Sequence, residues 1–569
     1  MSLKHLFSSI LLIGLIGCDN LPVAQDPPIL ANIPTMAEVA DSLNNISALA
    51  SKWAVIEDSI VYSDPYSIDW VKEFQSFLKD NVNKQRFVDA YVVSDSTQSG
   101  IRTVDFKATS ETQEIKSVKI VLDKGRVTHY SVRKERFNLL SSSRQFFSFD
   151  GSSYELSVKQ SIKWFFNNDQ FVHGNILPQG KLWRGVFKHE KAGIPIQFVI
   201  NPNNELIVKN DEEFLNFSAI ETKGDSTVYE SAYFSSCFIL SSVNDSTLEG
   251  QWINKKRDVP QSIYVKATSN SSYRFKPAEN PFINISGSHK FMFLDEDGEA
   301  EETNVLKLEQ NKFMLTGSLL TETGDYRFLE GIVRNDSMFL STMDGTHLMY
   351  FEGLIENEKI TGQFLAGSSY SQNWTAELNV PVELSSPESI TKMVPGSQFD
   401  FSFPDENGNI VSMSDERFTD KVLLVSIMGT WCSNCLDESR FLKEINDEFP
   451  SDKISIVALD YELIGDSSKV IQNIKKYKRN MNIDFPILLA ATLSSKDVAS
   501  KTLPALNGIF SYPTLLVLNK KHEVIKIHTG FNGPATGKDN YDAFTRKYRN
   551  LISELIENLK IKLWNERRT

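Results

Sequence analysis

The feature that most constrains the fold of this chain is a cysteine pair, Cys432 and Cys435, placed between an expected strand and an expected helix. Residues 421–428 form an almost continuous apolar run, as expected of a strand that is buried on both faces. Apolar side chains recur at helical spacing from residue 436 to residue 449. The pattern predicts an α/β domain in which the first cysteine begins a helix.

The elements around this pair have an order that predicts a thioredoxin fold over residues 396–560. A hairpin is expected at Asn407-Gly408, which separates two short apolar segments. A second central strand, a crossover helix, a second hairpin and a closing amphipathic helix follow at residues 454–459, 470–477, 515–529 and 541–559.

The position of Cys432 predicts a reactive thiol. A thiolate, and not a thiol, attacks a disulfide, and the unpaired N–H groups at a helix N-terminus favour negative charge. Cys435 lies one helical turn further in, which suits a resolving cysteine that attacks the mixed disulfide. The intervening Ser433 and Asn434 carry no charge to stabilise a thiolate, so a reducing or intermediate potential is expected.

The cysteines lie in the string Gly-Thr-Trp-Cys-x-x-Cys at 429–435, which includes Trp431, and Tyr512-Pro513-Thr514 follows about eighty residues later. Together these two motifs resemble those of the TlpA/ResA group of membrane-tethered thiol–disulfide oxidoreductases. The resemblance covers the C-terminal domain. It implies a cis proline at Pro513 beside the cysteines, with neighbouring backbone that pairs with an extended client segment.

The resemblance also implies a role for Glu438, which matches an acidic residue near the active cysteines of ResA-like proteins. A buried carboxyl group there would relay protons to or from Cys435. The alternative is a solvated glutamate that the helix dipole favours in the first turn. Ser426 occupies the strand position where thioredoxin has a buried aspartate, so Glu438 is expected to be the only nearby acid.

Other chemistries of the cysteine pair are weaker alternatives. A zinc site would need a second pair of ligands, but Cys237 lies in another domain and His522 and His528 are the only close histidines. No metal and no cofactor is therefore predicted. A peroxiredoxin-like peroxidase shares the fold, but Thr430 lies two rather than three residues before Cys432.

The first residues resemble a bacterial lipoprotein signal. An apolar run too short for a transmembrane helix ends in Leu-Ile-Gly before Cys18. The prediction is a signal peptide at 1–17, lipidation of Cys18 and a tether at 18–35. The protein is then expected outside the cytoplasm, held at a bacterial membrane by its lipid.

Between tether and redox domain, the sequence predicts an α+β domain at 36–178 with helical spacing up to about residue 84. Two antiparallel β modules follow at 179–270 and 282–379, each a sandwich or open barrel, and they look like a diverged repeat. Asp225-Ser226 and Gly250-Gln251-Trp252 correspond to Asp336-Ser337 and Gly362-Gln363-Phe364. A serine- and proline-bearing linker is expected at 380–395.

The net charge and the predicted domains limit which partners are expected for this protein. The net charge of −13 argues against nucleic acid, because phosphate binding needs clustered Lys and Arg. Protein thiols or disulfides are the expected clients, with a membrane-linked electron donor or acceptor. The alternative is a binding or scaffold lipoprotein with a secondary redox domain, in which aromatics of the β modules form a binding face (Trp252, Tyr326 or Trp374). Cys237 is expected to be a buried strand residue.

Overall fold

The structure is a computed structural model that describes residues 28–557 except 46–48, 57–58, 68, 76, 79, 99, 152, 164–165, 270, 272 and 277–282. It forms two compact units. The first comprises Met1–Asn44, Asp69–Gly151 and Ser157–Asn167, and the second comprises Asn45–Ile68, Ser152–Leu156 and Asn168–Thr569. The predicted signal peptide, Cys18 and residues 558–560 of the predicted redox domain lie outside the described residues.

The first unit combines short helices with an antiparallel meander. Its helices are α2 (Met36–Asn45), α3 (Trp70–Glu73) and the 3-10 turn η1 (Gln85–Phe87). Its strands pair in chain order: β3 (Tyr91–Gln98), β4 (Ile101–Ala108), β5 (Ile115–Asp123), β6 (Arg126–Phe137) and β7 (Ser141–Phe149). Phe74 and Phe77 pack on Phe147 in its core. Within the predicted tether, Leu30 exchanges two backbone hydrogen bonds with the side chain of Asn83.

The expected helical stretch up to residue 84 is broken by two strands of the second unit, β1 (Leu49–Ile56) and β2 (Ser59–Ser67). β1 pairs with β2 on one side and with β9 (Phe166–Leu177) on the other. Because both edges of β1 are hydrogen-bonded, tertiary pairing outweighs the local helical spacing. β8 (Ser153–Ile162) belongs partly to each unit.

The first β module is a closed eight-stranded barrel rather than a sandwich or open barrel. Its strands run in chain order and the last pairs with the first, which leaves no open edge. Trp252 is fully buried in its core, and the free Cys237 of the same barrel is buried as well. The strands are β10 (Lys181–Lys188), β11 (Gly193–Ile200), β12 (Glu205–Asn210), β13 (Glu213–Lys223), β14 (Ser226–Ser231), β15 (Ser236–Asn244), β16 (Thr247–Asn254) and β17 (Gln261–Thr268).

The second module closes in the same way, through the pairs β18–β26 and β19–β20. It has one extra short strand, β21 (Gly324–Asp325), which pairs with β20. Trp374 is fully buried in its core, so neither predicted tryptophan contributes to an exposed binding face. The strands are β18 (Gly287–Leu294), β19 (Ala300–Asn311), β20 (Met314–Thr321), β22 (Leu329–Arg334), β23 (Ser337–Met343), β24 (Leu348–Glu356), β25 (Lys359–Ala366) and β26 (Tyr370–Glu377).

The residues that suggested a repeat occupy equivalent strands. Ser226 and Ser337 begin the fifth barrel strand of each module, β14 and β23, when β21 is set aside. Gly250 and Gly362 lie in the seventh, β16 and β25. The two barrels therefore share strand order as well as the matched residues.

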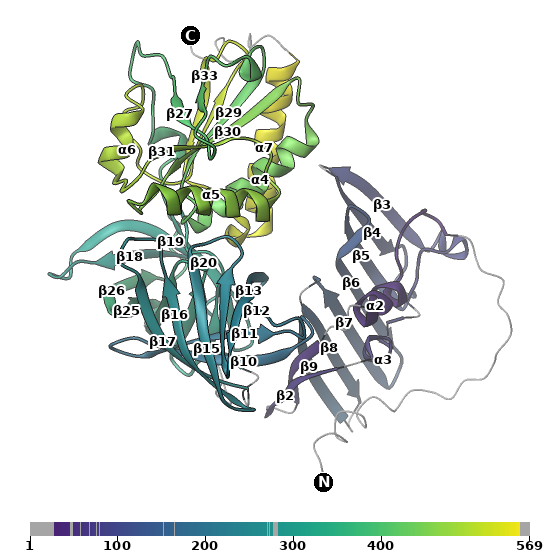
Figure 1. The fold of residues 1–569 in the computed structure, drawn as a ribbon. Helices are drawn as coiled ribbons and strands as arrows, with labels where there is room; N and C mark the ends of the chain where they lie inside the picture. The colour runs from purple at the N-terminus through teal and green to yellow at the C-terminus, as the bar shows by residue number, and fades with distance from the viewer. Residues whose placement is uncertain are drawn as a thin grey trace. The chain divides into compact units, whose positions relative to one another are not determined.

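The C-terminal domain, green to yellow in Figure 1, contains a five-stranded sheet of order β31-β30-β29-β32-β33. All residues of β29 (Val422–Met428) are buried, because Leu424 and Met428 face one core and Val425 and Ile427 face the other. The remaining elements are β27 (Ser402–Pro404), β28 (Ile410–Ser412), η3 (Glu416–Phe418), α4 (Ser433–Glu448), β30 (Ile454–Tyr461), α5 (Ser467–Met481), β31 (Ile487–Ala491), α6 (Lys496–Thr502), β32 (Thr514–Leu518), β33 (Val524–Thr529), η4 (Pro534–Thr536) and α7 (Lys538–Ile556).

The predicted linker at 380–395 is bound to the redox domain along its second half. Glu388, in the turn η2 (Pro387–Ser389), lies 2.6 Å from the amino groups of both Lys526 and Lys547. The backbone N–H of Thr391 donates to the Thr529 hydroxyl at 3.1 Å. Among the helices of the described residues, none is both long and apolar enough to cross a membrane.

Candidate active site

The cysteine pair lies at the start of α4, as its position after a buried strand predicted. Cys432 and Cys435 form a disulfide. Cys432 is the N-cap of the helix, and its sulfur accepts the backbone N–H of Cys435 at 3.1 Å. Cys432 retains 6% of its exposed surface whereas Cys435 is completely buried. The Cys432 sulfur is therefore the one that can attack another sulfur or be attacked by it.

The second motif meets the first at this sulfur. The Tyr512–Pro513 peptide bond is cis, and the Tyr512 carbonyl oxygen lies 3.5 Å from the Cys432 sulfur. Thr514 begins β32 and its hydroxyl donates to the Ser511 carbonyl at 2.9 Å. The Trp431 ring packs edge-on against the Tyr512 ring, with 5.7 Å between ring centroids. Residues 431 and 512–514, which belong to the two motifs named above, are thus adjacent to the disulfide.

Glu438 is buried in the first turns of α4, with 1% of its surface exposed, so the solvated alternative is wrong. One carboxyl oxygen accepts a hydrogen bond from the Ser426 hydroxyl on β29, and the other has no hydrogen-bond partner among the described residues. Burial raises the pKa of Glu438 to about 8, against the lowering effect of the Ser426 hydrogen bond. Glu438 is therefore mostly protonated at neutral pH and can act as a proton donor.

Two further carboxyl groups show that Glu438 is not the only nearby acid. Asp460 and Glu462, at the end of β30, are both buried and both accept the backbone N–H of Thr430 at 3.1 Å. Burial, and then the charge of Glu462, raises the pKa of Asp460 well above its ordinary value. Met428 of β29 pairs with Asp460, so strand register places these acids beside the motif. The two acids could have been predicted from the sequence, because parallel pairing of the two central strands places the residues at their ends side by side.

The second barrel contacts the start of α4 through the segment between β20 and β22. The guanidinium of Arg327 forms ion pairs with Asp437 of α4 and with Glu213 of the first barrel. It also donates to the Ser433 carbonyl at 3.0 Å and is 1% exposed. Burial disfavours its charge, but the two carboxylates more than offset this and raise the pKa of Arg327. No pattern in the sequence indicated that Arg327 would lie against the cysteine pair.

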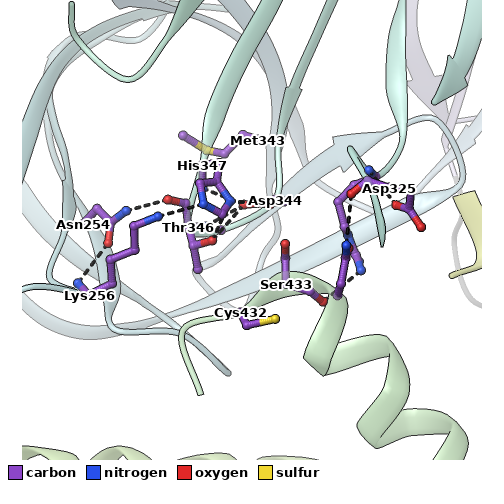
Figure 2. A network of polar contacts seen from close by, with 12 residues as sticks. Asn254, Lys256, Asp325, Met343, Asp344, Thr346, His347, Cys432 and Ser433 are labelled. Carbon is purple, nitrogen blue, oxygen red and sulfur yellow. Dashed lines mark hydrogen bonds and ion pairs between the residues drawn. The ribbon is translucent and has the colours of Figure 1, made fainter. Parts of the chain in front are cut away.

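A polar network of the barrels lies beside Ser433 (Figure 2). The Asp344 carboxylate contacts His347 Nδ1 at 2.9 Å and accepts the backbone N–H groups of Thr346 and His347 at 2.8 and 2.6 Å. Burial alone would raise the pKa of Asp344, but His347 and these hydrogen bonds reverse the effect and lower it. His347 Nε2 lies 2.8 Å from the amino group of Lys256 in the first barrel. Asp344 is therefore an anion held beside the redox helix.

These contacts surround a cavity of about 520 Å³ within the second unit. The redox domain contributes Cys432, Asn434 and Tyr512 to its lining, and the two barrels contribute Lys256 and Tyr326 among others. The cavity gives the Cys432 sulfur an opening to solvent.

A Cys-x-x-Cys disulfide that caps a helix, follows a buried parallel strand and faces a cis proline defines a thiol–disulfide exchange domain on a thioredoxin fold. Comparison with known proteins agrees with this class. The Redoxin family model matches residues 392–544.

Two curated relatives come from Bacillus subtilis. The chain is 27% identical over 131 residues to the thioredoxin-like protein YneN, a match that covers 23% of this chain and 68% of that protein. It is 27% identical over 130 residues to the thiol-disulfide oxidoreductase ResA, which covers 23% of this chain and 64% of that protein. The chain thus spans about two thirds of the length of these relatives.

Among solved structures, the chain resembles a thiol-disulfide oxidoreductase from Bacteroides fragilis at 22% identity. That match covers 28% of this chain and 99% of that one, with a TM-score of 0.21. A putative thiol:disulfide interchange protein DsbE from Chlorobium tepidum matches at 16% identity, with 27% and 93% coverage and a TM-score of 0.21. The C-terminal domain is a TlpA/ResA-like thiol–disulfide oxidoreductase domain, and the Redoxin family model matches it over residues 392–544.

Proposed function

We propose that this protein exchanges electrons with protein thiols outside the cytoplasm through Cys432 and Cys435, at a reducing or intermediate potential. The supporting observation is the position of the Cys432 sulfur, 3.5 Å from the Tyr512 carbonyl and open to the cavity. A lipid at Cys18 holds the chain at a membrane, where a membrane-linked donor or acceptor resets the cysteine pair.

In the reducing direction, the Cys432 thiolate attacks one sulfur of a client disulfide. A mixed disulfide forms and one client thiolate leaves. Cys435 then loses its proton and attacks the Cys432 sulfur, which releases the second client thiolate and restores the Cys432–Cys435 disulfide. Two electrons pass from the protein to the client. The Cys435 N–H and the N-terminal dipole of α4 stabilise the attacking Cys432 thiolate.

Glu438 and the residues around the cis proline complete the proposed site. Glu438, buried behind the cysteines, takes and returns the Cys435 proton in its ionised and protonated forms. The Tyr512 backbone beside Pro513 hydrogen-bonds an extended client, while Trp431 and Thr514 keep the two motifs in place. Client binding here orders the reacting sulfurs for in-line attack.

The direct test measures insulin reduction with dithiothreitol as the electron source. We expect C432S to reduce the rate to that of dithiothreitol alone, because it removes the attacking sulfur. C435S should instead accumulate a mixed disulfide with the client, which mass spectrometry detects. The matched control is C237A, which changes a buried barrel cysteine and should retain the wild-type rate. Equal rates for the wild type and C432S would refute the proposed exchange.

The anchor is tested separately in cells. A lipidated Cys18 incorporates a labelled fatty acid and places the full chain in the membrane fraction. C18A should lose the label, and C237A should keep it. Labelling of the C18A variant would refute the anchor and leave the redox proposal intact.

A further inference from the structure

The walls of the cavity at Cys432 come largely from the two barrels, not from the redox domain. Its volume of about 520 Å³ lies within the roughly 300–1,000 Å³ typical of small-ligand pockets. On the barrel side it is lined by apolar groups that include Tyr326, Met349 and Phe364. The centroids of the Tyr326 and Phe364 rings are 5.9 Å apart, which forms an aromatic wall.

The second barrel also covers one side of α4 and of the loop that contains the cis proline, Pro513. The Thr323 carbonyl accepts a hydrogen bond from the Ser511 hydroxyl at 3.1 Å. The Asp325 carbonyl accepts another from the Asn434 side chain, also at 3.1 Å. A Cβ atom on Gly530 would lie only 2.4 Å from the Thr323 carbonyl oxygen, so the two segments touch. A substrate therefore reaches Cys432 through the cavity.

The charges that line the cavity are not equivalent. Both acids already have internal partners: Asp344 is bound by His347, and Asp325 accepts the backbone N–H groups of Arg327 and Gly533 at 2.8 and 3.1 Å. The ammonium of Lys256 contacts His347 Nε2 and has three N–H donors in all, so it retains donors for a ligand. Burial lowers the pKa of Lys256 to about 8, which leaves it mostly protonated at neutral pH.

We propose that this cavity is a substrate pocket for disulfides that carry a carboxylate near the sulfur, with Lys256 as the group that binds the carboxylate. The carbon framework of the substrate packs on Tyr326 and Phe364 while its sulfur meets Cys432. The inference rests on the proposed exchange activity and specifies its substrate class. Lys256, which lies about 180 residues before the cysteines, is then a specificity residue supplied by the first barrel.

The reaction is the exchange already described, with a small disulfide R–S–S–R as oxidant. Cys432 forms a bond to one sulfur and RS⁻ leaves. Cys435 then displaces the second RS⁻ and the protein disulfide re-forms. The substrate gains two electrons, the dithiol loses them, and the two thiol protons pass to solvent or to the departing thiolates.

The test compares two aromatic disulfides of similar size on the full chain, reduced beforehand and freed of reductant. 5,5′-Dithiobis(2-nitrobenzoate) carries carboxylates, and 4,4′-dithiodipyridine does not. We expect K256M to lower the ratio of their second-order rate constants about tenfold, the loss typical of one charge-assisted hydrogen bond. K256R should restore the ratio, because it retains the charge. K255M, at the exposed neighbouring lysine, should keep the wild-type ratio.

A second arm uses peptide disulfides that differ only in Glu or Gln next to the cysteine. A Glu preference that K256M removes would identify a protein segment as the natural source of the carboxylate, and a preference confined to the aromatic pair would identify a small molecule. An unchanged ratio in K256M for both pairs overturns the pocket assignment while the exchange activity stands. The rate constant for the neutral reagent is the internal reference for each variant, and its failure to react with the wild type would instead refute the exchange activity.

Discussion

The two barrels have the same strand order but differ in one connection, and the longer connection, in the second barrel, contacts the start of α4. In the first barrel, β12 ends at Asn210 and β13 begins at Glu213, so a two-residue turn joins the third and fourth strands. In the second barrel, the equivalent connection runs from residue 322 to 328 and contains β21 and Arg327. A short insertion at one position thus brings the second barrel against the start of α4, whereas the first barrel reaches the cavity at Cys432 through Lys256.

The contacts of each barrel with the redox domain differ in burial as well. Arg327 of the second barrel is buried between Asp437 and Glu213. The first barrel contacts α5 through a partly exposed pair, Lys476 and Glu230, whose charged atoms are 3.1 Å apart. Buried charges cost several kcal/mol when they lose a partner, whereas exposed pairs contribute little. The inserted segment is therefore expected to determine how the second barrel holds the redox helix.

The largest effect is expected for R327M, which removes the charge while keeping most of the volume. Glu213 would remain buried without its ion-pair partner and Asp437 would keep only Arg440, at a cost of about 3–5 kcal/mol. We expect the midpoint of urea denaturation to fall. We also expect the rate at which Cys432 reacts with disulfides to become independent of the barrels. Urea denaturation followed by tryptophan fluorescence measures the first effect.

The control for R327M is R334M, at the end of β22 in the same barrel, where the guanidinium stacks on Phe339. Loss of this contact should cost no more than about 1 kcal/mol. Equal urea midpoints for the two variants would contradict the special role of the inserted segment.

An intermediate effect is expected for E438Q, which tests a part of α4 that depends on the redox domain alone. Folding raises the pKa of Glu438 from 4.5 to about 8, so the folded state holds the proton more tightly than the unfolded state. The stabilising effect of that proton is complete below pH 4.5 and is lost as the pH rises through 8. This loss amounts to a few kcal/mol. E438Q should flatten the decline in denaturation midpoint over that range.

The same variant should slow disulfide exchange by about 10- to 100-fold, as expected when a general acid–base group is lost. D447N, at an exposed site near the end of α4, provides the control for both measurements. A decline of stability with pH that E438Q leaves unchanged would show that Glu438 is not the titrating group.

The smallest effect is expected for K476M, which removes one contact of the first barrel with α5 and leaves the hydrogen bond from the Asn480 side chain to the Ala232 carbonyl in place. The Lys476 amino group pairs with Glu230 and donates to the Phe234 carbonyl at 2.8 Å, but the Glu230 side chain is 41% exposed. We expect a loss below about 1 kcal/mol and an unchanged exchange rate. A loss as large as that of R327M would mean that both barrels hold the redox domain equally.

Much of the redox site was predictable because its determinants are local in the sequence. A buried strand leads directly into Cys432 and helical spacing follows it, so this residue is expected at a helix N-terminus independently of the rest of the chain. The position of the Tyr512-Pro513-Thr514 motif beside the cysteines could be predicted from the resemblance to a family that has both motifs. By contrast, local helical spacing gave the wrong expectation for residues 49–67, because pairing with β9 decided that segment.

The sequence by itself determined the position and chemistry of the cysteine pair, since helix-capping geometry and apolar periodicity are properties of short segments. Only the tertiary structure decided which distant groups surround that pair. Arg327, Asp344 and Lys256 lie between 88 and 176 residues before Cys432 in the chain, and no local pattern relates them to it. Barrel closure and strand register bring them together, because burial and ion pairing depend on distances in space rather than along the chain.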